Sequence, residues 1–170
     1  MRKRILLLCI LCIGLAMGKA KGQTATFKAL FLYNFTKNID WPASQGSKEL
    51  IITVLGDDEI SAELGKIAKV KKAGNKTIKV LSVNSLKEIR QSHILFVGSA
   101  KSGLMSTLSY EQRDKPVLIV GDKSGLCKQG AGISFMTVDG KLRYEISPSS
   151  IAKHQLKVTQ KIISLGIEVQ

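Results

Sequence analysis

The sequence predicts one α/β domain built on a mostly parallel β-sheet with helices on its faces. Between Leu50 and Gly121, apolar strand-like runs alternate with segments of helical spacing, and parallel strands require such crossover connections. Further on, an Asp-Gly pair at residues 139–140 separates two more strand-like runs, which is the pattern of a β-hairpin. We therefore expect an antiparallel C-terminal hairpin at the sheet edge, followed by a closing helix.

Residues 1–22 are predicted to be a signal peptide. Three cationic residues at positions 2–4 precede an apolar run from Ile5 to Met17 and then small residues. That run is too short to span about 30 Å of hydrocarbon, although an uncleaved anchor is the alternative interpretation. Cleavage fits after Gly22, or alternatively after Ala20. Export would leave residues 23–170 as a single domain with its own core and no membrane span.

The charge balance is basic. The formal net charge of the whole chain is +13, and removal of residues 1–22 takes away five basic residues and leaves +8. A solvated lysine-rich surface is the simplest explanation, and attraction to anionic lipid or an acidic partner comes second. No nucleic-acid partner is expected, because no basic stripe with interleaved aromatic residues is present.

Cysteine usage argues against internal disulfides. Cys9 and Cys12 would leave with the signal peptide, so Cys127 is the one thiol expected in the exported domain. It is either buried and inert or exposed and able to pair with another chain. No histidine or second cysteine stands near it in sequence, so we expect no metal site there.

The first element expected is a helix over residues 25–40, whose apolar residues recur at helical spacing and give one buried face. The Trp41-Pro42 pair ends it, because the residue before proline avoids helical angles. Two aromatic residues, Tyr33 and Trp41, lie off the main apolar stripe. Aromatic side chains with a polar tip are frequent at interfaces, so both are candidates for partner or dimer contact.

The later elements follow from apolar runs and turn signals. The run at residues 50–56 is too apolar for a one-sided sheet, which predicts a buried strand. Further strands are expected at 77–83, 93–98, 116–121, 133–138 and 141–146, and helices at 58–69, 85–91, 102–110 and 148–167. The basic segment 69–76 is expected to be a loop. Pro148 and Ser149 open the last helix, which has apolar residues at helical spacing.

Three of the expected strands end alike, with a glycine followed by a polar residue. Those polar residues are Asp57, Ser99 and Asp122. The carboxyl ends of parallel strands meet at one edge of a sheet, where open α/β sheets usually place ligands, so the three residues are candidates for a shared ligand rim. Turn and cap chemistry alone predicts the same pattern, and both interpretations stay open.

No catalytic or cofactor motif emerges. The glycine-rich loop 121–133 contains Gly130-x-Gly132 but lacks the third glycine, and a strand follows it instead of a helix, which disfavours a dinucleotide site. There is no P-loop and no G-x-S-x-G elbow, and nothing local pairs Cys127 with His154. We therefore expect a protein that is not an enzyme and needs no cofactor. The loop itself is either an adaptable contact surface or a plain connection.

Several motifs in order resemble the YfiR-like family of periplasmic proteins. They are FLYNFTKNIDWP (residues 31–42), PVLIVGD followed by the glycine loop, GISFMTVDGKLRYEIS (132–147) and the closing amphipathic helix. The matching positions are Tyr33, Asn34, Phe35, Trp41, Pro42, Gly121, Asp122 and Gly140 through Ile146. The resemblance covers essentially the whole domain after the signal peptide.

This resemblance implies a Rossmann-like three-layer sandwich that forms a homodimer and represses signalling without catalysis. The implied partner is the periplasmic sensor domain of an inner-membrane diguanylate cyclase, so that binding lowers cyclic-di-GMP and biofilm formation. Better-known members carry disulfides in the domain, whereas this chain offers only a bridge between subunits through Cys127. The residues expected at partner or dimer contacts are Tyr33, Trp41, Asp122, Cys127, Arg143 and Tyr144. A small-molecule-binding sensory module, with a sensor histidine kinase as partner, is the alternative.

Overall fold

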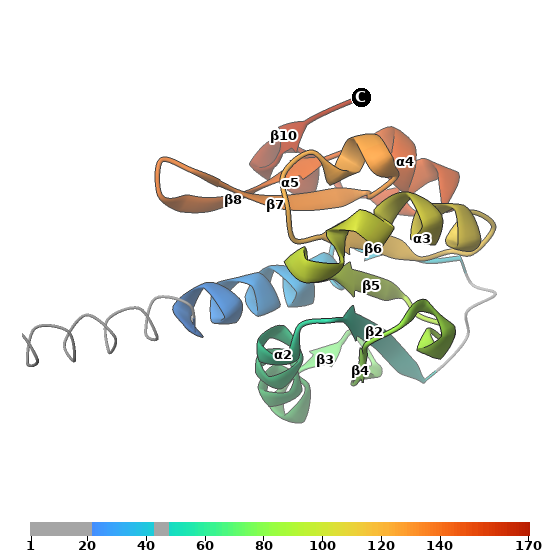
Figure 1. Ribbon diagram of the computed structural model, residues 1–170. Helices are drawn as coiled ribbons and strands as arrows, with labels where there is room; N and C mark the ends of the chain where they lie inside the picture. The colour runs from blue at the N-terminus through green and yellow to red at the C-terminus, as the bar shows by residue number, and fades with distance from the viewer. Residues whose placement is uncertain (1–21, 43–47) are drawn as a thin grey trace, which may run out of the picture.

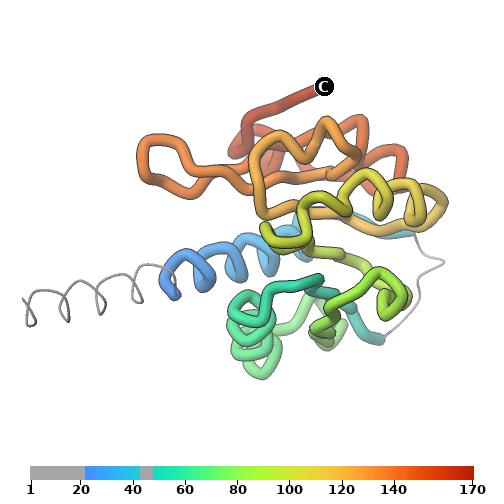
Figure 2. The backbone as a smooth tube through the Cα atoms, in the orientation of Figure 1, coloured from blue at the N-terminus to red at the C-terminus, as the bar shows by residue number. Residues whose placement is uncertain are grey.

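The computed structural model describes residues 22–42 and 48–170 (Figure 1). The predicted signal peptide, with Cys9 and Cys12, lies outside the described residues except for Gly22, which belongs to the first helix. The described part of that helix covers residues 22–35, and Figure 2 shows it between the C-terminal part of the chain above and the segment of residues 58–70 below.

The main sheet has eight strands in the order β10-β8-β7-β6-β5-β2-β4-β3. The strands are β2 (Glu49–Leu55), β3 (Lys72–Ala73), β4 (Lys76–Val83), β5 (Ile94–Val97), β6 (Leu118–Gly121), β7 (Ile133–Val138), β8 (Lys141–Ile146) and β10 (Ile167–Glu168). Neighbours from β4 to β7 pair in parallel, whereas β3 and β8 are antiparallel to β4 and β7. The sheet is therefore mixed, with parallel pairing through its middle and antiparallel pairing at β3–β4 and β7–β8. The expected C-terminal hairpin is present as β7 and β8.

Helices cover both faces of the sheet. Besides the first helix they are α2 (Asp58–Val70), α3 (Met105–Gln112), α4 (Pro148–Lys153), α5 (Gln160–Leu165) and the 3-10 turns η2 (Leu86–Glu88), η3 (Ser99–Leu104) and η4 (Leu126–Gln129). In β5, Ile94 and Phe96 join the buried cluster of the first helix, α2, α4 and α5, whereas Leu95 and Val97 join that of α3 and η4. Because side chains alternate along a strand, these clusters lie on opposite faces, which gives a three-layer arrangement.

An aromatic cluster joins the first helix to the hairpin. The ring centroids of Phe35 and Tyr144 lie 5.4 Å apart in a T-shaped contact, and Phe135 stacks on Phe35 at 6.3 Å. The hydroxyl of Tyr144 donates to the carbonyl of Ile162 at 2.6 Å. Aromatic pairs of this kind stabilise by about 1 kcal/mol each beyond the area they bury. This cluster therefore anchors the carboxyl half of the first helix.

Three expected helices differ from the structure. The helix expected at 85–91 is only the 3-10 turn η2, and the loop expected at 69–76 contains the end of α2 and the strand β3. The first helix ends at residue 35 and is followed by a turn and the short strand β1 (Ile39–Asp40), which pairs with β9 (Lys157–Val158). Instead of one closing helix over 148–167, the chain forms α4, β9, α5 and β10. Gln155 has φ of 58°, a left-handed conformation that a continuous helix does not allow. Strand pairing of β9 and β10 then replaces helical hydrogen bonds.

Candidate functional site

The sheet changes winding direction between β2 and β5. The chain leaves β2 through α2 to reach β4 on one side, and leaves β5 through η3 and α3 to reach β6 on the other. The two loops diverge at the carboxyl ends of these strands, which is where doubly wound sheets place ligands. The two loops pass close to each other where they leave the strands. A Cβ added to Gly98 would lie 2.7 Å from the carbonyl oxygen of Gly56.

A cavity of about 600 Å³ lies at this switch point, and we call it the switch-point cavity. Its lining residues are Thr24, Ala25, Lys28, Asp57, Glu59, Ile60, Ser99 and Asp122. The structure thus brings together the three residues of the predicted rim. One of them also has a structural role, because the Asp57 carboxylate accepts from the backbone N–H of Ile60 at 3.0 Å and caps α2. The cap interpretation is therefore confirmed at Asp57, which also lines the cavity.

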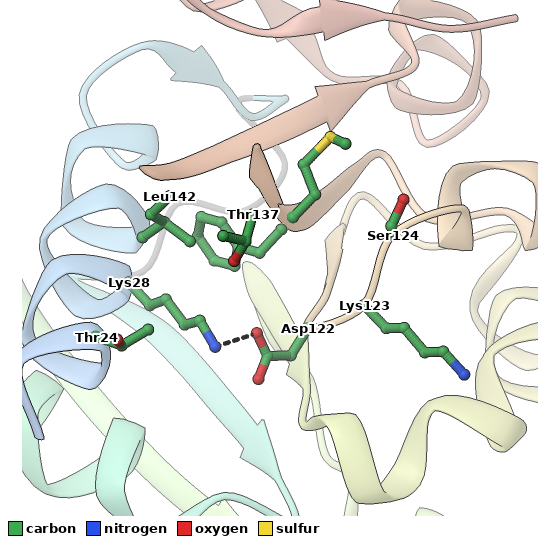
Figure 3. Close-up of a pocket in the computed structure, with 9 residues that line it drawn as sticks. Thr24, Lys28, Asp122, Lys123, Ser124, Thr137 and Leu142 are labelled. Carbon is green, nitrogen blue, oxygen red and sulfur yellow. Dashed lines mark ion pairs between the residues drawn. The ribbon is translucent and has the colours of Figure 1, made fainter. Parts of the chain in front are cut away.

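A nearly buried ion pair closes one side of the cavity. The Lys28 ammonium lies 2.5 Å from Oδ1 of Asp122, and the two side chains are 17% and 8% exposed (Figure 3). Beyond the pair lies a second cavity of about 210 Å³, which β7 and β8 line with Phe135 and Leu142. Burial raises the pKa of Asp122, and this effect outweighs the opposite influence of Lys28. Lys28 therefore offsets only part of the energetic cost of burying the ionised Asp122 carboxylate.

Lys28 was not among the site residues predicted from the sequence. Its position offered one signal, because Lys28 precedes Leu32 and Phe35 at i, i+4 and i+7 and so belongs to the stripe that carries the buried residues of the first helix. A lysine on a buried stripe requires a partner of opposite charge. The identity of that partner, ninety-four residues away, depends on the fold.

The six predicted contact residues do not form one surface. The Tyr33 side chain is 8% exposed and its hydroxyl faces the carbonyl of Lys72, and Trp41 is half-buried with its indole N–H donating to the carbonyl of His93 at 3.1 Å. Tyr144 lies in the aromatic cluster and Asp122 in the switch-point cavity. Arg143 is exposed on β8. Aromatic contact to a partner is therefore better sought elsewhere on the first helix.

Cys127 is buried, which is the first of the two alternatives predicted from the sequence. It is 5% exposed, and its Sγ accepts a hydrogen bond from the Ser134 hydroxyl at 3.4 Å. Burial raises the pKa of the thiol to about 11, so the reactive thiolate is scarce at neutral pH. A disulfide between subunits would require this thiol to leave the core.

Among residues 22–42 and 48–170, no cluster of three His, Cys, Asp or Glu side chains is arranged to hold a metal ion. Over the same residues, no helix has the length and apolar character needed to cross a bilayer.

The fold and this cavity define a doubly wound α/β domain whose polar strand-end residues converge at the switch point. The chain belongs to the YfiR/HmsC-like family, whose family model matches residues 25–167 and confirms the resemblance seen in the sequence. Members of this family are known as periplasmic regulators of diguanylate cyclases and are not a known enzyme class.

One similar solved structure is a conserved domain protein from Vibrio cholerae O1 biovar El Tor strain N16961. It has a TM-score of 0.57 and 9% sequence identity over 86% of this chain, which supports the fold alone. The chain spans 60% of the length of that protein. No curated protein sequence gives a significant match.

Proposed function

We propose that this protein is an exported, non-enzymatic regulator that binds the periplasmic sensor domain of an inner-membrane diguanylate cyclase and lowers its output. Family membership supports this role, because regulation of such cyclases is what the family is known for. The exported location rests on the signal-peptide pattern of residues 1–22 and on the same family membership. Self-association into a homodimer belongs to the same proposal.

The observation that carries partner binding is an apolar surface on the outer side of the first helix. Phe27 and Leu30 are 49% and 42% exposed, although they lie one turn apart on a helix anchored in the core. Beside them a cavity of about 520 Å³ opens between Phe27, Phe31 and Leu142 of the hairpin. We call Phe27, Leu30, Phe31 and Leu142 the Phe27 surface. Apolar surface of this kind, with polar residues at its rim, is typical of protein interaction sites.

Repression needs a difference in affinity between two receptor states. If the protein binds the inactive conformation of the sensor domain about 3 kcal/mol more tightly than the active one, it shifts the receptor equilibrium by roughly a hundredfold. Binding that is equal in both states would shift nothing. The proposal therefore requires the Phe27 surface to contact a part of the receptor that changes between states.

The direct test measures binding of the purified domain to the purified periplasmic segment of the receptor, together with cyclic-di-GMP in cells. Phe27→Glu and Leu30→Glu should each weaken binding at least about tenfold and raise cyclic-di-GMP, since they place a charge on the apolar contact. Val70→Glu is the matched control, because Val70 is 76% exposed on α2. Wild-type affinity in Phe27→Glu and Leu30→Glu, with the fold intact by circular dichroism, would reject this surface.

The same variants separate receptor binding from self-association. Light scattering of the wild-type domain gives its mass in solution, and a dimer that Phe27→Glu converts to a monomer would assign the Phe27 surface to the homodimer. A dimer unaffected by that change would leave the surface free for the receptor. A monomer at all concentrations would reject the homodimer.

A sensory module that binds a small molecule, with a sensor histidine kinase as partner, is a second candidate. The switch-point cavity favours it, because about 600 Å³ falls within the size range of small-molecule sites. Capture of a kinase sensor segment, together with failure to capture the cyclase segment, would support it.

A further inference from the structure

A cavity of about 120 Å³ lies between α3, α4 and the turn that follows η4, and we call it the α3–α4 cavity. Its lining residues are Ser109, Arg113, Gly130, Ser150, Lys153 and His154. None of them lines the switch-point cavity or belongs to the Phe27 surface. The volume is below the about 300–1,000 Å³ typical of sites for drug-sized ligands, so the α3–α4 cavity admits one small group.

The charges at this cavity are positive. Arg113 and Lys153 line it, and none of the described lining residues is acidic. Lys153 forms no ion pair within residues 22–42 and 48–170. Asp114 lies 3.4 Å from Nε of Arg113, but its side chain is 85% exposed, so water screens much of its charge. The cavity therefore favours an anion over a cation.

The polar side chains around the cavity have hydrogen-bond donors to spare. The half-buried hydroxyl of Ser109 forms no hydrogen bond within the described part of the chain. The hydroxyl oxygen of Ser150 accepts from Ser147 at 3.0 Å, which leaves its own O–H free to donate. Arg113 donates from Nη1 to the carbonyl of Tyr110 at 2.8 Å, which leaves Nη2. A cluster of such donors with positive charge matches the oxygens of a phosphate group.

His154 adds a buried group with a fixed orientation. The residue is 5% exposed, and its Nδ1 lies 2.9 Å from the carbonyl oxygen of Lys115. Because a carbonyl oxygen can only accept, Nδ1 carries a proton, and Nε2 is the ring atom left for a ligand. Nε2 forms no hydrogen bond within residues 22–42 and 48–170. It accepts from a P–OH group when the ring is neutral and donates to a phosphate oxygen when the ring is protonated, so phosphate suits either state.

Gly130 makes room for one of these donors. A Cβ at this position would collide with the hydroxyl oxygen of Ser109. The missing side chain therefore lets the Ser109 hydroxyl stay at the wall of the cavity, against the turn that precedes β7.

We propose that the α3–α4 cavity binds a phosphate group through the charged side chains of Arg113 and Lys153. Hydrogen bonds to Ser109, Ser150 and His154 complete the site. The bound phosphate joins α3 to α4, which lie far apart in the sequence, so it stabilises the folded protein. Binding at this site does not depend on the identity of the receptor.

Calorimetry and thermal melting of the purified protein with inorganic phosphate test the site. Phosphate should bind and raise the melting temperature, whereas nitrate, a planar anion, should do neither at the same ionic strength. Glycerol 3-phosphate distinguishes the source of the group. Tighter binding than inorganic phosphate would indicate a phosphate ester such as a lipid headgroup, and weaker binding would indicate free phosphate.

Variants separate the cavity from the general positive charge of the protein. Arg113→Gln and Lys153→Gln should each weaken phosphate binding at least about tenfold, because each removes a charge-assisted hydrogen bond. Ser109→Ala should also weaken binding and leave the melting temperature of the ligand-free protein unchanged, since this hydroxyl has no partner in the described part of the chain. The matched control is Lys128→Gln, which removes the same charge from an exposed position on η4 outside the cavity lining.

Three outcomes would overturn the proposal. They are absence of phosphate binding, an equal response to nitrate, and equal losses in Lys153→Gln and Lys128→Gln, which would indicate attraction to net charge. Amide chemical shifts of Ser109 and Ser150 give a readout that does not depend on stability, and they should move on addition of phosphate while that of Val70 on α2 does not. Receptor capture by the Phe27 surface is measured in phosphate-free buffer, so either proposal can fail alone.

Discussion

The Nδ1 atom of His93 accepts a hydrogen bond from the backbone N–H of Ile51 at 3.0 Å. Because Nδ1 accepts, the neutral ring carries its proton on Nε2, and that atom has no partner within the described part of the chain. The residue is 1% exposed, and burial together with the Lys76 charge lowers the pKa of His93 from 6.5 to about 4. The folded protein therefore holds a neutral imidazole in its core.

This histidine should make the protein sensitive to mild acid. The pKa is lower in the folded state, so the unfolded chain takes up the proton first as the pH falls, and stability decreases between pH 6.5 and 4. The full effect is about 3 kcal/mol. Urea unfolding at several pH values should show this loss in the wild type and a shallower slope in His93→Asn, whose amide oxygen replaces Nδ1 as acceptor. Equal slopes in the two proteins would contradict the assignment.

Loss of Lys28 and loss of Asp122 should lower the free energy of unfolding by different amounts. Lys28→Met leaves a carboxylate that is 8% exposed without its cation and should cost about 3 kcal/mol at pH 7. Asp122→Asn leaves the more exposed ammonium, which reaches water more easily, and should cost less. Because the pKa of Asp122 is raised in the folded state, ionisation of this carboxyl weakens the fold as the pH rises, and Lys28→Met should enlarge that loss. Equal losses of stability in the two variants would contradict the argument from the different exposure of the two side chains.

Short sequence patterns predicted correctly those elements whose backbone hydrogen bonds join residues close in sequence. The hairpin of β7 and β8 follows from the Asp-Gly pair, and its strands have the expected bounds, because Asp139 and Gly140 adopt the positive φ that the turn requires. Glycine after a parallel strand also predicted where Asp57, Ser99 and Asp122 would converge. These features depend on turn chemistry and strand direction, which a short segment encodes.

Such patterns did not predict the pairing of strands that lie far apart in the sequence. The closing segment has helical apolar spacing, yet β9 pairs with β1 more than a hundred residues away, and β10 pairs with β8. The exposure of the aromatic residues also depends on tertiary packing, which buries Tyr33 and leaves Phe27 at the surface. Nothing in the sequence around Tyr33 and Trp41 indicated whether their rings pack in the core of the domain or contact a partner protein.

Trp41 should contribute to stability more than to binding. Its indole packs against the core and lies edge-on to His93 at 5.9 Å, and its N–H donates to the His93 carbonyl. Trp41→Ala should therefore lower stability by about 3 kcal/mol, and Trp41→Phe by less, because the ring remains while the hydrogen bond is lost. Thermal melting and receptor capture on the same samples distinguish the roles. An unchanged melting temperature with lost capture would place Trp41 in the interface instead.

Cys127 should be protected in the folded protein. Since burial raises the pKa of its thiol to about 11, modification by iodoacetamide at pH 7.5 should be slow in the native state and fast in urea. Non-reducing electrophoresis should show a monomer. Rapid native modification, or a dimer that reductant dissolves, would instead support the bridge between subunits.

Gly130 should be intolerant of a side chain for two separate reasons. Its φ is 100°, which L-residues rarely adopt, and a Cβ there would collide with the Ser109 hydroxyl. Gly130→Ala should therefore lower the free energy of unfolding by about 2 kcal/mol or more. Gly65 offers the matched control, because it lies inside α2 with no heavy atom within 4 Å of an added Cβ, and Gly65→Ala should stabilise the protein by about 0.5–1 kcal/mol. Urea unfolding of both variants checks the pair, and a similar change in both would show that the left-handed turn before β7 carries no special constraint.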